Sequence, residues 1–87
     1  MEWKKRYDFE LEHFSDIGKQ FGRKVRQLRM KQGITQEELA FRSGLNRNYI
    51  SDAERGARNI SLISVSRLAK GLEVEIHTLF QFEKQDT

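Results

Sequence analysis

The chain has 87 residues, of which 16 are Lys or Arg and 13 are Asp or Glu, and it contains neither cysteine nor proline. This length fits one domain, and the lack of cysteine excludes disulfides and thiolate metal sites. No apolar run approaches the roughly 20 residues of a membrane helix, and residues 1–8 lack the apolar stretch of a secretion signal. We therefore expect one cytoplasmic domain.

Charge is unevenly distributed along the chain. Residues 1–16 contain three basic and five acidic side chains, whereas residues 17–87 contain 13 basic and 8 acidic ones. A basic excess in the body of a domain is typical of a phosphate-binding surface. It is equally typical of ordinary solubilising charge, so charge alone leaves both interpretations open.

Residues 1–16 are predicted to form an extra N-terminal arm or helix. Trp3, Tyr7, Leu11 and Phe14 follow one another at steps of four, four and three, which places them on one stripe of a helix, with Phe9 outside it. Large apolar side chains are costly to leave in water. Three outcomes are open for the arm: packing on its own domain, packing on a partner subunit, or no packing in solution.

Helical periodicity predicts a first body helix over residues 17–32. Phe21, Val25 and Leu28 define its buried face, and Gly33 ends it. The next helix is expected over 36–43. Thr35 and Glu38 form a capping box at its start.

Three further helices are expected after Gly44. Asn46 is a good N-cap for a helix over 47–55, and Ser61 for one that continues to Leu72. A last short helix is expected over 75–82. Strand patterns are absent, so the fold class is all-α: a five-helix body over 17–82, followed by a tail over 83–87.

The spacing of the two central helices indicates a helix-turn-helix. Two short helices joined by a glycine-centred turn, Ser43-Gly44-Leu45, cross steeply. Ala40 supplies the small residue that close crossing requires. The apolar residues expected to hold the pair to the core are Leu39, Leu45 and Ile50.

The outer face of helix 47–55 is polar. Its polar residues are concentrated at the N-terminal end, which is the end that enters a major groove in such motifs. The candidates for base contacts are Arg47, Asn48, Tyr49, Ser51 and Asp52. Arg47 can bond guanine O6 and N7, and Asn48 can bond adenine. Arg47 could instead contact phosphate, Tyr49 could be a half-buried packing residue, and Asp52 could accept from cytosine N4 or orient Arg47 or Arg55.

The central segment GITQEELAFRSGLNRNYISDAERG resembles the helix-turn-helix domains of phage repressors and Cro proteins, also called the xenobiotic-response-element family. The resemblance continues through RNISLISVSRLAKGLEVEIHTLF and covers residues 18–82. It implies a lambda-repressor-like domain that binds double-stranded DNA and regulates transcription. Within the family, the segments NRNYIS, ERGARNISL and AKGLEV are most similar to controller proteins of restriction–modification systems.

The resemblance also implies roles for individual positions. Gln36 would bond a phosphate and support the first recognition residue, and Arg29 with Glu54 would form a structural ion pair between the first and third helices. The phosphate candidates are Gln36, Arg42, Arg58, Asn59 and Arg23. Two positions depart from the family: Ala53, where a large aliphatic is usual, and Glu73, where glycine is common. A neighbour, such as the aromatic arm, is expected to fill the space beside Ala53.

Family members bind two half-sites about one helical turn apart, ~34 Å, as two-fold dimers. The predicted function is therefore a homodimeric regulator, a repressor or an activator, on a near-palindromic operator. The predicted interface residues are Ile76, Leu79, Phe80 and Phe82, although Leu79 or Phe80 could be core. The alternative is an antitoxin or protein-interaction module that retains the fold.

No pattern in the sequence indicates an enzyme, a cofactor or a metal. His13 and His77 are far apart, and no glycine-rich phosphate loop, nucleophile elbow or carboxylate pair is present. Enzymatic chemistry is therefore not expected.

Overall fold

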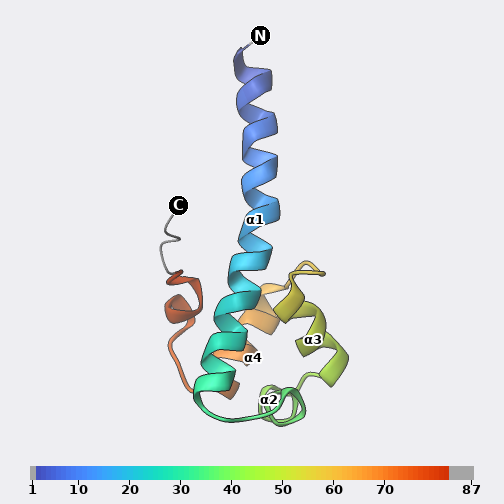
Figure 1. The fold of residues 1–87 in the computed structure, drawn as a ribbon, viewed down its shortest axis with the longest axis vertical. Helices are drawn as coiled ribbons and strands as arrows, with labels where there is room; N and C mark the ends of the chain where they lie inside the picture. Colours follow the sequence, from blue (N-terminus) through green and yellow to red (C-terminus); the bar gives the residue numbers. More distant parts are fainter. Residues whose placement is uncertain (1, 83–87) are drawn as a thin grey trace.

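The computed structural model describes the backbone of residues 2–82 and the side chains of residues 17–82; the tail predicted over 83–87 lies outside these residues. In chain order the elements are α1 (Glu2–Lys31), α2 (Gln36–Ser43), α3 (Arg47–Arg55), α4 (Leu62–Leu72) and the 3-10 helix η1 (Ile76–Phe80). Figure 1 shows α2, α3, α4 and η1 gathered around one half of α1, whose other half extends beyond them. The all-α prediction is confirmed. We call residues 17–82 the body and residues 2–16 the extension.

Two elements differ from the prediction. The first helix does not begin at Ile17 but runs without a break from Glu2 to Lys31, because the arm carries no proline or glycine that would interrupt it. The last element is a 3-10 helix over Ile76–Phe80 rather than an α-helix over 75–82. At five residues, it is as short as such helices usually are.

The core forms where α1 packs on α3 and α2 packs on α4. Side chains from every body element meet there without solvent exposure. The largest of them are Leu39, Ile50, Leu68, Leu72, Leu79 and Val25. Leu79 was predicted at a dimer interface, and this prediction is wrong, because the side chain is 0% exposed. A residue sealed inside its own domain cannot contact a second copy.

The three predicted N-caps are confirmed. The side chains of Thr35, Asn46 and Ser61 accept hydrogen bonds from the backbone amides three residues later. The reverse half of the predicted capping box is replaced, since the Glu38 carboxylate accepts from Arg42 Nε at 3.0 Å. These caps fix where α2, α3 and α4 begin.

A close approach between α1 and α3 explains the small residue at position 53. A methyl group on Gly22 would overlap the backbone carbonyl oxygens of Ala53 and Glu54. Ala53 is 1% exposed. The α1 backbone at Gly22 therefore lies against α3 beside Ala53, as the expectation of a neighbour at this position requires; the side chains of the aromatic arm lie outside those that the structure describes.

Glu73 ends α4 in the conformation that glycine favours. Its φ of 59° and ψ of 44° lie in the left-handed region, and its backbone N–H points to the carbonyls of Ala69 and Lys70. The turn thus keeps its form without glycine. The Gln32 side chain supports it by donating from Nε2 to the Leu72 carbonyl at 2.7 Å.

Candidate nucleic-acid interface

The first turn of α3 presents two polar side chains to solvent. Arg47 and Asn48 are both exposed, and within the body neither has a side-chain partner. The Asn46 cap, which accepts from the Tyr49 amide at 2.8 Å, holds this turn in helical form. The donors of Arg47 and Asn48 are therefore free for a ligand.

Tyr49 and Arg58 form a stacked pair beside this edge. The Arg58 guanidinium carbon lies 4.5 Å from the centre of the Tyr49 ring, within the range of a cation–π contact. Tyr49 is half-buried. We call the first turn of α3, with Arg47 and Asn48, the reading edge, and the contact between Tyr49 and Arg58 ties the loop after α3 to it.

Asp52 holds two arginines on the exposed side of α3. Its carboxylate accepts from Arg55 at 2.6 Å and from Arg58 at 2.8 Å. The hydrogen bond from Arg58 is the main reason that the pKa of Asp52 lies below its usual value, and the charge of Arg55 adds to the effect. Asp52 is therefore ionised at neutral pH, and it positions basic side chains.

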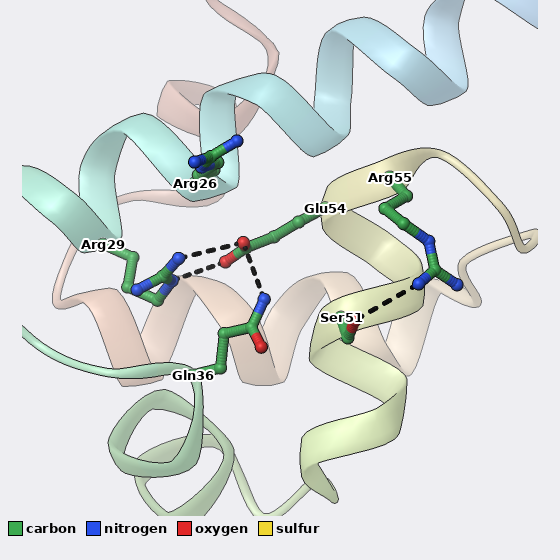
Figure 2. A pocket seen from close by; sticks show the side chains of 6 residues that line it. All are labelled: Arg26, Arg29, Gln36, Ser51, Glu54 and Arg55. Atoms are coloured by element: carbon green, nitrogen blue, oxygen red, sulfur yellow. Dashed lines mark hydrogen bonds and ion pairs between the residues drawn. The ribbon is translucent and has the colours of Figure 1, made fainter.

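A buried network fixes α3 against α1. Arg29 donates to Glu54 from Nε at 2.6 Å and from Nη2 at 3.1 Å, and also to the Ile34 carbonyl at 2.9 Å. Gln36, the first residue of α2, donates from Nε2 to Glu54 at 3.1 Å. Figure 2 shows the three side chains converging from α1, α2 and α3. Gln36 retains one amide proton and its carbonyl oxygen for another partner.

A polar cavity of about 290 Å³ opens beside this network. It is lined by Arg26, Arg29, Gln36, Ser51, Glu54 and Arg55 (Figure 2). No binding role was predicted for Arg26, which is exposed and has no side-chain partner within the body. Its spacing of three residues from both Arg23 and Arg29 was the available signal, since these positions share one side of a helix. The basic character of this cavity comes from Arg26, because Arg29 is paired with Glu54 and Arg55 with Asp52.

The remaining predicted phosphate residues are dispersed. Arg23 and Asn59 are exposed, and Arg42 forms an ion pair with Glu38 on the surface of α2. Arg58 lies next to α3 through Asp52 and Tyr49. The structure therefore brings Gln36 and Arg58 close to α3, while Arg42 is engaged within its own helix.

A second apolar surface lies around η1. Ile76 is 50% and Phe80 43% exposed, and Phe82 is half-buried. Ring contacts connect this surface to the core, with centroids 5.2 Å apart for Phe21–Phe80 and 6.2 Å apart for Phe80–Phe82. Three of the four predicted interface residues thus remain accessible.

Two short helices crossing at a glycine turn, with a polar edge on the second, define a helix-turn-helix DNA-binding transcriptional regulator. The family described as Helix-turn-helix matches residues 25–79. The chain belongs to this family. Among the described residues, no helix has the length and apolar character that crossing a membrane requires.

Several relatives are control proteins. Control protein C.BamHI of Bacillus amyloliquefaciens is 49% identical over 63 residues, which are 71% of this chain and 78% of that protein. Control protein C.MunI of Mycoplasma sp is 37% identical over 67 residues, 76% of this chain and 90% of that protein. The restriction-modification controller protein C.AhdI from Aeromonas hydrophila superposes with a TM-score of 0.71 and 48% identity over 75% of this chain and 97% of its own. The resemblance to controller proteins is thus confirmed.

Proposed function

We propose that the protein binds a near-palindromic operator as a homodimer, with α3 in the major groove, and controls the genes of a restriction–modification system. The observation that carries this proposal is the exposure of Arg47 and Asn48 at the start of α3, where neither side chain has a partner among residues 17–82. Arginine and asparagine make the two-bond contacts to guanine and adenine that discriminate bases by about 1–3 kcal/mol each. A regulator of this kind acts in the cytoplasm, where the DNA is.

The backbone of the DNA would be held by two groups of side chains next to α3. The first is Arg58 and Asn59, in the loop after the helix. The second is Gln36, Arg26 and Arg55, which line the cavity and offer amide and guanidinium donors to a phosphate. Gln36 is fixed by Glu54, so a phosphate bonded there would set the register of α3.

Dimer formation is proposed through the surface of Ile76, Phe80 and Phe82. Their exposure leaves apolar area that a two-fold partner can cover. Sedimentation equilibrium at tens of micromolar tests this part. An assembly of at least two copies is expected, and Ile76→Asp should halve its mass, whereas a wild-type monomer at that concentration would contradict the proposal.

The DNA-binding part is tested by selecting duplexes from a random pool with the full chain. Enrichment of an inverted repeat is expected, and Arg47→Ala should abolish the preference at one position of each half-site. Lys70→Ala removes the same charge from an exposed site on α4 and serves as the control. A pool without any enriched sequence would favour the alternative, a protein-interaction module, and would overturn the proposal.

Restriction–modification control is tested separately from DNA binding. The similarity to control proteins such as C.BamHI supports this assignment. Genes for a methyltransferase and an endonuclease are expected next to the gene of this protein, with the selected repeat upstream of them. A neighbouring toxin gene instead would overturn this part and leave the DNA-binding proposal intact.

A further inference from the structure

The extension carries a pattern that the DNA-binding function does not use. Trp3, Tyr7, Leu11 and Phe14 lie on one stripe of α1. The same stripe continues into the body, where Phe21 and Val25 are buried in the core. The extension therefore repeats the apolar periodicity of a helix that is covered on one face.

This half of α1 stands apart from the other elements. Residues 2–16 of the helix would span about 22 Å at 1.5 Å per residue. Figure 1 shows this part rising beyond α2, α3, α4 and η1. The family match begins only at residue 25, so the extension lies outside the segment shared with helix-turn-helix relatives.

The charge of the extension is polarised along the helix. Residues 4–6 are Lys-Lys-Arg, whereas residues 8–16 contain four acidic residues and no Lys or Arg. Two such helices side by side in the same direction would place like charges together. If the two helices run in opposite directions, the basic end of each lies along the acidic part of the other. The opposite charges then attract at both ends of the pair, which favours the antiparallel arrangement.

We propose that the extension pairs with the extension of a second copy of this chain, in antiparallel orientation, through the stripe of Trp3, Tyr7, Leu11 and Phe14. Such a pair places the two bodies at opposite ends of the helix pair and leaves the η1 surfaces free. It is therefore distinct from the proposed operator-binding dimer, and it would join two such units so that their α3 helices can contact separate stretches of DNA.

Direction of pairing can be tested by cross-linking, because the chain has no cysteine of its own. We would introduce Lys4→Cys and Ser15→Cys in separate full-length chains and oxidise them alone and mixed. The mixture should form the mixed disulfide dimer, and Lys4→Cys alone should form at least tenfold less. Efficient cross-linking of Lys4→Cys alone would show parallel pairing, and no cross-link in any sample would show no pairing; either result overturns the proposal.

Affinity of pairing can be followed by fluorescence, because Trp3 is the one tryptophan in the sequence. On dilution from tens of micromolar, its emission should shift to the red as pairs dissociate. Leu11→Asp, on the stripe, should raise the dissociation constant at least tenfold. Phe9→Asp introduces the same charge off the stripe and should leave it unchanged, while an equal effect of both substitutions would overturn the proposal.

These readouts require no DNA, so they separate this proposal from the proposed function. Leu11→Asp should still select the same inverted repeat as the wild-type chain, because the reading edge of α3 lies in the body. Loss of pairing with retained operator binding is the expected result. Retained pairing in Leu11→Asp would overturn the assignment of the stripe whether or not the protein binds an operator.

Discussion

Arg29 on α1 and Glu54 on α3 form a two-bond ion pair at 2.6 and 3.1 Å, with only 13% and 4% of their side chains exposed. Glu54 lies in the last turn of α3, at the end opposite Arg47 and Asn48, and also accepts a hydrogen bond from the side-chain amide of Gln36. Buried charges need complete pairing to be tolerated. The orientation of the reading helix is thereby coupled to the stability of the domain.

Removing one partner of this pair should be costly. Glu54→Ala leaves the Arg29 guanidinium buried without its counter-charge, and we expect a loss of about 3 kcal/mol in the free energy of unfolding. Urea unfolding followed by circular dichroism measures it. The control is Glu38→Ala in the exposed pair with Arg42, where 34% and 47% of the side chains are accessible and at most about 1 kcal/mol is expected. Equal losses in the two variants would contradict the role given to Glu54.

Two glycines on α1 make a matched pair for testing the contact between α1 and α3. Gly22→Ala should destabilise the protein by about 1–3 kcal/mol, because the new methyl group overlaps the carbonyls of Ala53 and Glu54. Gly18→Ala meets only the Gly56 carbonyl oxygen, at 3.9 Å. It should stabilise the helix by about 0.5–1 kcal/mol.

Thermal unfolding of the two variants measures both effects. Operator affinity should fall with Gly22→Ala, since α3 must shift to make room, and should be unchanged with Gly18→Ala. A higher melting temperature in both variants would show that α1 and α3 can separate without cost.

The sequence was sufficient to predict the helix-turn-helix because its boundaries depend on local chemistry. Thr35, Asn46 and Ser61 are side chains that cap helices, and each does so. What depends on distant contacts was harder to predict. The burial of Leu79, the cavity next to Arg26 and the close approach of Gly22 to Ala53 all result from how α1 packs across α3 and η1. Residue spacing within one helix contains little information about such packing.

Glu73 offers a test of backbone strain. Its φ of 59° is unfavourable for a residue with a Cβ atom, and left-handed conformations cost such residues roughly 1–2 kcal/mol. Glu73→Gly should therefore raise the free energy of unfolding by about 0.5–1 kcal/mol, after the greater freedom of glycine in the unfolded chain is subtracted. Chemical denaturation measures the change.

The control for that variant is Glu75→Gly, two residues later, where φ is −69° and no strain is released. It should not stabilise the protein. If both variants gained stability, removal of an acidic side chain would be the cause rather than backbone conformation.

The pH dependence of Asp52 follows from its two arginine partners. Because its pKa is below the usual value in the folded state, the ion pairs contribute fully above the pKa of an unfolded aspartate. Their contribution is lost only as the pH falls through the lowered pKa. Carboxyl chemical shifts of Asp52 in a titration should have their midpoint below that of an aspartate in an unfolded chain. A midpoint at or above the usual value for aspartate would contradict the observed pairing.

Asp52 should also limit how strongly the protein binds DNA of any sequence. Its carboxylate holds Arg55 and Arg58 and repels phosphate, so Asp52→Asn should strengthen binding to random duplexes. The salt dependence should steepen, since each additional phosphate contact changes the logarithmic slope by about 0.9. Fluorescence anisotropy at several salt concentrations measures both quantities.

The matched control is Glu75→Gln, which neutralises one exposed carboxylate beside η1, and its slope should equal that of the wild type. If Asp52→Asn weakened binding to one operator sequence and left random DNA unaffected, Asp52 would be a base-reading residue and the positioning role would be wrong.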